Sequence, residues 1–367
     1  MREGAIKRDR IRRVVVRGTN WVGDAVLTIP ALRELRRVLP EAHITLATRP
    51  WAEGLFADAD FLDDLLIYDR GERPLGALLR QMREWRRRRF DLALLFQNAF
   101  EAALIARAAR IPFRLGYATD ARGPLLTHPL KVPPWRGERH EVFYYLNLVA
   151  ELERRLDGAT NITEHEPRFA LDVSAARRAE AHELLRAHGA RTGDAPLVAL
   201  CPGSTNSRAK RWPAERYAAL ADLLIERADA DVALIGSRDE EEVSREVAAL
   251  MRHRPIMLTG RTELAQAVAV LSLADVLVTN DTGPAHIAAA LERPTLVIFG
   301  PTVPATTAPF SGAAEIIRRP PDCAPCMLRD CPIDHRCMTA ISPEEVFARA
   351  FALLERRYAA AAAEIKG

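Results

Sequence analysis

The chain has 367 residues, of which 49% are hydrophobic and 28% are charged, and its formal net charge is +3. One hydrophobic core rarely serves more than about 250 to 300 residues, so this length predicts two domains, and the composition argues against extended disorder. The sequence has no apolar run of the roughly 20 residues that cross a bilayer and no signal peptide in its start MREGAIKRDR, so we expect a cytoplasmic protein.

Apolar, β-branched runs alternate with amphipathic patterns along the first half. This alternation is typical of parallel strands joined by crossover helices, so the predicted fold class is α/β. The predicted strands are Arg13–Arg17, His43–Thr48, Leu65–Tyr68 and Asp91–Gln97. The predicted helices are Ala25–Val38, Leu75–Arg88 and Ala99–Ala109.

The same alternation begins again in the second half, after a polar segment, Asp157–Ser174, that is typical of a linker. We therefore expect domains 1–170 and 171–367, with ligands bound at the carboxyl ends of both sheets. The predicted strands are Leu197–Cys201, Asp231–Ile235, Val276–Thr279 and Thr295–Phe299. The predicted helices are Ala214–Arg227, Glu240–Arg252, Leu264–Leu273 and a short one after Gly283.

The first segment with chemical potential is Arg17-Gly-Thr-Asn-Trp-Val-Gly-Asp24, between a strand and a helix. Backbone N–H groups at such a junction favour an anion. Gly18 and Gly23 do not have the spacing of a dinucleotide fingerprint, and no Walker lysine follows them, which argues against a nicotinamide dehydrogenase. Asp24 has two interpretations, a helix cap or a general base that deprotonates a sugar hydroxyl.

The second segment is Leu200-Cys-Pro-Gly-Ser-Thr-Asn-Ser-Arg-Ala-Lys-Arg-Trp-Pro213. Ser204 and Thr205 offer hydrogen-bond donors, and Lys210 supplies a cation near the start of a helix. That combination suits a diphosphate, whose negative charge grows as a glycosidic bond breaks. The alternative is that Lys210 is an ordinary surface lysine.

The third segment is Val278-Thr-Asn-Asp-Thr-Gly-Pro-Ala-His286, again between a strand and a helix. Asp281 ends the strand, and the backbone N–H groups of Thr282 and Gly283 are placed to bind a phosphate. His286 falls in the first helical turn, where it either faces the ligand or packs as a structural residue. At a similar junction, Glu240 either binds ribose hydroxyls or complements the helix dipole with its acidic neighbours.

Four of the five cysteines lie close together in the sequence, at Cys323, Cys326, Cys331 and Cys337. Such thiols are candidates for a structural zinc site, and the alternatives are an iron–sulfur cluster, unligated thiols or a labile disulfide. A catalytic zinc is disfavoured because four sulfur ligands leave no open position. The remaining cysteine, Cys201, follows a strand and is expected to be buried.

The sequence contains two basic blocks, Arg2–Arg17 and Arg80–Arg89. They have two interpretations: they attract an anionic partner, or they are a solvated surface with no partner.

The three segments together resemble the ADP-heptose:lipopolysaccharide heptosyltransferases, a family of inverting glycosyltransferases with the GT-B fold of two Rossmann-like domains facing across a cleft. The resemblance runs from Val14 to the helix after Pro343 and is most specific in Trp21-Val-Gly-Asp24, Ala209–Pro213 and Asn280–His286. The Trp-Val-Gly-Asp form is more similar to heptosyltransferase II than to heptosyltransferase I.

The resemblance implies a role for each candidate residue. Asp24 matches the catalytic base, and Lys210 matches the lysine that holds the donor diphosphate. The donor-binding loop would be Asp281, Thr282, Gly283 and His286, and Glu240 resembles a glutamate that binds the ribose. The resemblance also implies that catalysis needs no cofactor or divalent metal.

By the same resemblance, the N-terminal domain binds the acceptor and the C-terminal domain binds ADP-heptose. The acceptor would be the heptosyl-Kdo2-lipid A core at the inner face of the cytoplasmic membrane, an anionic lipid that gives the basic blocks a purpose. The final helix is expected to pack back on the N-terminal domain, and nucleic acid is not an expected partner. The alternatives are another nucleotide-sugar transferase, a sugar-nucleotide epimerase or a non-catalytic binding module.

Overall fold

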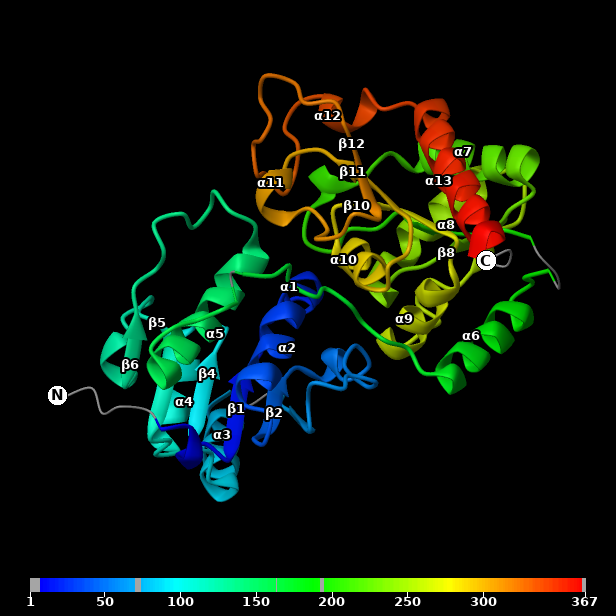
Figure 1. Cartoon of the computed structure of the whole chain (residues 1–367). Helices are drawn as coiled ribbons and strands as arrows, with labels where there is room; N and C mark the ends of the chain where they lie inside the picture. Colours follow the sequence, from blue (N-terminus) through cyan, green and yellow to red (C-terminus); the bar gives the residue numbers. More distant parts are fainter. Residues whose placement is uncertain (1–6, 70–73, 163, 192–194, 365–367) are drawn as a thin grey trace. The chain divides into compact units, whose positions relative to one another are not determined.

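The computed structural model describes residues 7–69, 74–162, 164–191 and 195–364. The chain divides into two compact units, Met1–Phe169 and Ala170–Gly367. Each unit contains a six-stranded sheet whose neighbouring strands are all parallel, with helices packed around it (Figure 1). The predicted α/β class is therefore confirmed.

The sheet of the first unit has the strand order β3-β2-β1-β4-β5-β6. The chain builds outward from β1 to β3 and then returns to place β4 on the other side of β1, so the strand order reverses between β1 and β4. The strands are β1 Arg13–Arg17, β2 His43–Thr48, β3 Asp64–Ile67, β4 Leu92–Leu95, β5 Phe113–Tyr117 and β6 His128–Leu130.

The helices of the first unit form two groups. One group, α1, α2 and α5, packs together, and α3 packs against α4. Side chains on β1 alternate, so Val15 joins the core with α3 and α4 while Val14 and Val16 point to the opposite face. The helices are α1 Val22–Leu27, α2 Ile29–Val38, α3 Pro74–Arg88, α4 Phe100–Ala108 and α5 Glu141–Asp157, with short 3-10 helices η1 Arg8–Arg10, η2 Pro50–Ala52 and η3 Gly123–Leu125.

The predicted helix Ala25–Val38 is wrong in its start and its continuity. The first helix begins at Val22, and Thr28 separates α1 from α2. Pro30 has no N–H to donate to a carbonyl in the preceding turn, which explains the interruption. The hydroxyl of Thr28 donates to the carbonyl of Ala25 at 2.6 Å.

The sheet of the second unit has the order β12-β11-β10-β7-β8-β9. Counted from its own first strand, β7, this is the same winding as in the first unit, and the order reverses between β7 and β10. The strands are β7 Leu197–Cys201, β8 Asp231–Leu234, β9 Ile256–Met257, β10 Val276–Asn280, β11 Thr295–Phe299 and β12 Ala314–Arg318.

The helices of the second unit also form two groups, α7 with α8 and α13, and α6 with α9 and α10. The fully buried Val198, Leu200, Val276 and Val278 pack in the core beneath α7 and α13. The helices are α6 Ala175–Ala187, α7 Ala214–Ala228, α8 Glu241–Leu250, α9 Leu264–Leu273, α10 Gly283–Ala290, α11 Pro304–Thr307, α12 Arg336–Thr339 and α13 Pro343–Glu364, with 3-10 helices η4 Arg208–Lys210 and η5 Arg238–Glu240.

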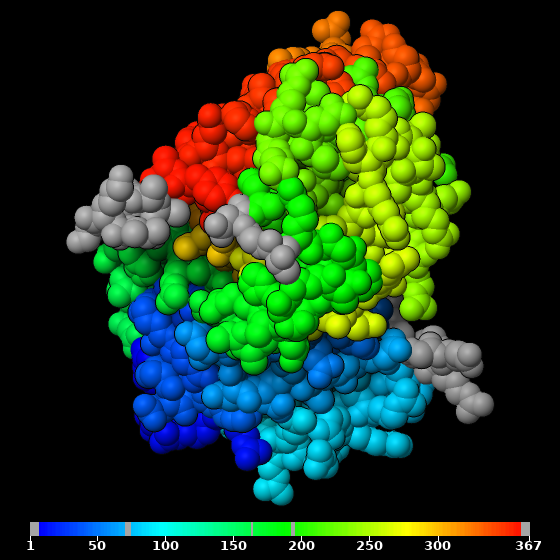
Figure 2. Space-filling model, turned by 90° about the vertical axis from the view of Figure 1, so that its right-hand side faces the viewer, coloured from blue at the N-terminus to red at the C-terminus, as the bar shows by residue number. Residues whose placement is uncertain are grey.

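The final helix, α13, packs mainly on α7 and over β10 and β11 of its own unit. Figure 2 shows it in red on the outer surface of that unit. Its expected packing on the N-terminal domain stays a prediction. None of the described helices, α13 included, is long and apolar enough to cross a membrane.

The two reversals in strand order decide where ligand sites belong. At such a reversal, the loops that follow the two neighbouring strands turn away from each other, to opposite sides of the sheet. A crevice therefore opens between them at the carboxyl ends of the strands. In the first unit this crevice lies between the loops after β1 and β4. In the second it lies between the loops after β7 and β10. All three segments singled out from the sequence follow one of these strands.

Candidate functional site

The loop after β1 leads into α1 within a few residues. The N–H of Gly18 donates to the carbonyl of Ala47 at 2.9 Å, and a Cβ on Gly18 would lie 3.3 Å from Leu46 Cδ1, so the loop starts in close contact with β2. Trp21 is the N-cap residue of α1, and half-buried Asp24 is the third residue of the helix. Placing Asp24 at the cap was therefore wrong, because the helix starts earlier, although the helix N-terminus still stabilises its carboxylate.

A tyrosine of the first unit lies near Asp24. Burial raises the pKa of Tyr145 on α5 well above its usual range, and the negative charge of Asp24 raises it further. The Tyr145 ring packs on Phe96, with 5.5 Å between the ring centroids. Asp24 thus occupies the carboxyl edge of the sheet beside a neutral tyrosine that sequence reasoning did not identify.

In the second unit, the fully buried Asn280 ends β10 and holds two loops in place. Its Oδ1 accepts hydrogen bonds from the N–H of Trp212 at 3.1 Å and from the hydroxyl of Tyr217 at 3.2 Å. Its Nδ2 donates to the carbonyls of Pro202 at 2.9 Å and Gly203 at 3.0 Å. An amide has two acceptor and two donor positions, so all four are filled. Asn280 fastens the loop after β7 and the start of α7 to β10.

Lys210 and Asp281, both predicted from sequence, lie together in the structure. Lys210 Nζ donates to Asp281 Oδ2 at 2.7 Å and to the carbonyl oxygen of Asp281 at 3.1 Å. The same Oδ2 accepts a hydrogen bond from the hydroxyl of Thr302 at 2.7 Å. Lys210 is therefore held by a buried carboxylate rather than extending freely into solvent, and Thr302 is a partner that sequence reasoning missed.

The start of α10 lies directly after Asp281. Thr282 is the N-cap residue, and its side chain makes no capping hydrogen bond. Pro284 has no N–H, and Ala285 donates its own to the carbonyl of Thr282 at 3.1 Å, so the N–H groups of Thr282 and Gly283 precede the first helical bonds. His286 is buried in the first turn of α10, and its contact with the donor stays a prediction.

The loop after β7 is fixed by Arg211. This guanidinium donates from Nε and Nη2 to the carbonyl of Ser204 at 3.2 and 3.1 Å. Ser204 itself is buried, whereas Thr205 is exposed. Of the two predicted hydroxyl donors, Thr205 is the one that solvent reaches.

Glu240 caps its own helix and also contacts the loop after β7. Its Oε2 accepts from the N–H of Ser237 at 2.8 Å and from the hydroxyl of Ser237 at 2.9 Å. Its Oε1 would lie 2.3 Å from a Cβ on Gly203, so only glycine leaves room for the carboxylate there. Burial of Cys201, together with the charge of Glu240, raises the pKa of that thiol. One oxygen of Glu240 therefore caps the helix, close to the predicted alternative of complementing the helix dipole, and the other oxygen faces the loop after β7.

The segment that bears four cysteines supports the turn before Lys210. The N–H of Ala209 donates to the carbonyl of Arg329 at 2.9 Å, and His335 Nε2 donates to the carbonyl of Ala209 at 2.7 Å. The hydroxyl of Ser207 lies 3.2 Å from the same Arg329 oxygen. These contacts make the cysteine segment part of the scaffold around Lys210.

The thiols themselves are unbonded in the structure. All are free cysteines, and burial, followed by the nearby thiols, raises the pKa of Cys337. Within the described residues, no three His, Cys, Asp or Glu side chains are arranged to hold a metal ion. The structural zinc predicted at these cysteines stays a prediction, which elemental analysis of the purified protein would check.

Replacing Asn280 with alanine should destabilise the second unit. The change leaves buried backbone groups of Trp212, Pro202 and Gly203 without partners, and each such group costs about 1 to 3 kcal/mol. We expect Asn280→Ala to lower the free energy of unfolding in urea by at least about 2 kcal/mol. Asn206→Ala, in the exposed part of the same loop, is the control and should change little. Equal stability of the two variants would contradict the role given to Asn280.

The contact between Gly203 and Glu240 predicts a non-additive pair of substitutions. Gly203→Ala forces the carboxylate of Glu240 aside, and we expect a loss of about 1 to 3 kcal/mol in unfolding free energy. In a Glu240→Ala background the same change should cost less than about 0.5 kcal/mol, because the obstructing atoms are gone. A double-mutant cycle measured by urea unfolding checks this, and additive losses would rule the contact out.

A family model and several known proteins match this chain. The family model described as glycosyltransferase family 9 (heptosyltransferase) matches residues 78–336. A lipooligosaccharide heptosyltransferase 2 of Haemophilus influenzae is 31% identical over 83% of this chain and 88% of that protein. A lipopolysaccharide heptosyltransferase 2 of Salmonella typhimurium is 30% identical over the same shares.

A solved structure gives the same result for the fold. The ADP-heptose lipopolysaccharide heptosyltransferase II of Escherichia coli has a TM-score of 0.81 and 27% identity, covering 94% of this chain and 99% of that one. The resemblance inferred from the sequence, including its GT-B fold, is therefore confirmed. The chain belongs to glycosyltransferase family 9, the heptosyltransferases.

Proposed function

We propose that this glycosyltransferase moves a heptose from ADP-heptose to the heptosyl-Kdo2-lipid A core of lipopolysaccharide, with inversion at the anomeric carbon. The names of the relatives support the heptose donor and the lipopolysaccharide acceptor. The structural observation that carries the proposal is the cation of Lys210, held by Asp281 directly before the N-terminus of α10.

Lys210 is suited to the departing diphosphate. An ammonium group has three N–H donors, and two of them go to Asp281, so one remains for a phosphate oxygen. The N–H groups of Thr282 and Gly283, which precede the first helical bonds of α10, are proposed as further donors. As the bond from the anomeric carbon to ADP breaks, these groups stabilise the charge that develops on the diphosphate, without a divalent metal.

Asp24 is the proposed general base. It takes the proton from the acceptor hydroxyl while that oxygen forms its bond to the anomeric carbon and ADP departs from the opposite face. The half-buried position of Asp24 in the first turn of α1 leaves the carboxylate accessible, and the helix N-terminus favours its charged form. The Oε1 of Glu240, which faces the loop after β7, and the exposed hydroxyl of Thr205 are proposed contacts of the donor.

We further propose that the first unit receives the acceptor at the inner face of the cytoplasmic membrane. The basic residues of α3 support this, since an anionic lipid surface attracts arginine. Part of the first basic block, Arg2 included, lies outside the described residues. Attachment to the membrane would then be peripheral.

Asp24→Asn tests the mechanism. Acceptor-dependent release of ADP should fall by about 100-fold or more, because a general base typically contributes about 10² to 10⁴ in rate. The KM for ADP-heptose should change little, since Asp24 belongs to the acceptor side. Asn20→Ala, in the same loop, is the matched control and should keep most of the rate.

The same assay separates the alternatives. An epimerase would convert ADP-heptose without an acceptor, and a binding module would release no ADP. If Asp24→Asn retained more than about a tenth of the rate, general-base catalysis by this residue would be excluded. Lys210→Ala should instead raise the KM for the donor and lower kcat together.

A further inference from the structure

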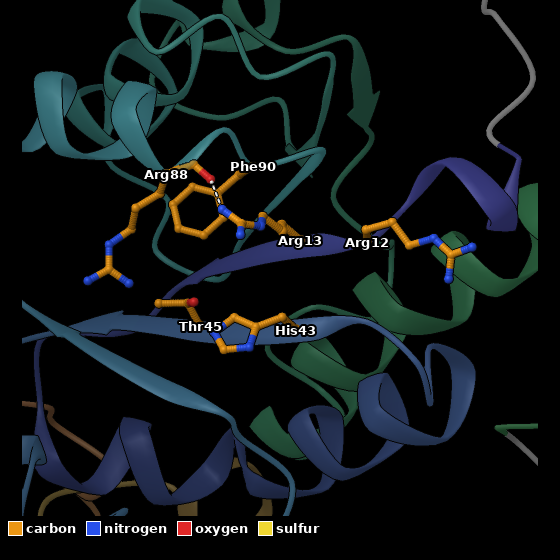
Figure 3. Close-up of a pocket in the computed structure, with 6 residues that line it drawn as sticks. All are labelled: Arg12, Arg13, His43, Thr45, Arg88 and Phe90. Atoms are coloured by element: carbon orange, nitrogen blue, oxygen red, sulfur yellow. Dashed lines mark hydrogen bonds between the residues drawn. The ribbon is translucent and has the colours of Figure 1, made fainter.

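A pocket of about 330 Å³ opens at the amino edge of the first sheet. It lies at the start of β1 and β2, whereas the loop that leads to Asp24 follows the end of β1. Figure 3 shows the side chains around it, which come from β1 and the residue before it, from β2, from the end of α3 and from the connection between α3 and β4. The pocket is lined by Arg12, Arg13, His43, Thr45, Arg88 and Phe90.

The two basic blocks of the sequence meet at this pocket. Arg13 belongs to the first block and Arg88 to the second, and Nη1 of Arg13 donates to the carbonyl of Arg88 at 2.9 Å. Arg13 is paired in register with His43 on the neighbouring strand, so the two side chains share a sheet face. In Figure 3 the guanidinium of Arg12 points away from the other five residues.

The carboxylates nearby are already engaged. Arg88 pairs with Glu84 through Nε at 2.7 Å and with Asp64 through Nη1. Hydrogen bonds from Arg87 and Arg88 lower the pKa of Glu84 to about 2, so it stays ionised. The acidic Asp91 accepts from the backbone of β1. Among the described residues, Arg13 has no carboxylate partner and Nη2 of Arg88 makes no hydrogen bond.

Thr45 supplies an independent sign of a missing ligand atom. Its side chain lines the pocket and is fully buried, and its hydroxyl has no hydrogen-bond partner within the part of the chain that the structure describes. Buried hydroxyls are nearly always paired, since an unpaired one is destabilising. The unpaired hydroxyl lies in the same pocket as two guanidinium groups with unfilled donors.

We propose that this pocket binds a phosphate group, held by the guanidinium groups of Arg13 and Arg88 and by the hydroxyl of Thr45, with His43 at the rim. Guanidinium forks match the oxygens of a phosphate, and a hydroxyl donor completes its coordination. The site lies in the first unit, apart from the residues proposed for the donor, and does not depend on the proposed function. The phosphate belongs either to a soluble molecule or to the headgroup of an anionic lipid.

Calorimetric titration of the full chain with inorganic phosphate tests the site, with ADP present in excess to occupy the donor loops. Arg13→Gln should weaken phosphate binding at least tenfold, and Thr45→Val should weaken it at least threefold. Arg80→Gln removes the same charge from an exposed position on α3 and is the matched control, with less than a twofold effect.

A second arm identifies the source of the phosphate. Flotation with phosphatidylcholine vesicles, with and without phosphatidylglycerol, measures binding to headgroups in the same variants. Binding to the anionic vesicles that is lost in Arg13→Gln and Thr45→Val but kept in Arg80→Gln supports a lipid source. If the same two variants lose binding of inorganic phosphate, Arg80→Gln keeps it, and no variant binds the anionic vesicles, the result supports a soluble source of the phosphate.

Two outcomes overturn the proposal. One is that neither inorganic phosphate nor anionic vesicles bind the unmodified chain. The other is that Arg80→Gln loses as much binding as Arg13→Gln, which would mean attraction by general surface charge. Melting temperatures measured by circular dichroism establish that the variants are folded. If Arg13→Gln is unfolded, Arg13→Lys keeps the charge, loses the fork and should still weaken phosphate binding at least threefold.

Discussion

The amide of Asn280 is the constraint on which the donor side depends. A buried amide must fill both donor and both acceptor positions, and here every partner is a backbone group or side chain of the β7 loop or the start of α7. That requirement holds the segment containing Lys210 beside the end of β10. The ion pair between Lys210 and Asp281 is then possible because the two segments have been fixed by their neighbouring residue, not because opposite charges attract across solvent.

The segment that bears the four cysteines also holds the turn before Lys210 in place. Its contacts with Ser207 and Ala209 involve backbone carbonyls and the ring of His335. Gly300 brings it close, since a Cβ there would lie 2.4 Å from Met338 Sδ. This segment therefore shapes the turn before Lys210 whatever its thiols bind, and the spacing of the cysteines alone gave no sign of that structural role.

The central strands were predictable because strands buried on both faces of a parallel sheet are continuous apolar runs. The bounds of β1, β2, β7 and β11 agree with their predicted ranges. The edge strand β3 was predicted as Leu65–Tyr68, but β5, β6, β9 and β12 were missed. Of these, β6 is only three residues long and contains Pro129, β9 has two residues, and half-buried β12 contains Glu315. The candidate site was predictable only as separate motifs. Thr302 lies 21 residues from Asp281, and nothing in local sequence indicates that pairing, because the fold creates it.

Arg13 and Arg17 show why position in the fold does not decide where an anion binds. They lie on the same face of β1, and Arg17 is at the carboxyl edge, where α/β sheets usually bind ligands. Yet Arg17 is buried, donates to Gln81 and Gln97, and stacks 3.6 Å above the ring of Tyr68, so its charge stabilises the sheet. At the amino edge, Arg13 lines a pocket together with Thr45, whose hydroxyl has no hydrogen-bond partner among the described residues. The unfilled hydrogen-bond donors of Arg13 and Thr45, rather than the usual ligand position at the carboxyl ends of the strands, place the proposed phosphate at the amino edge.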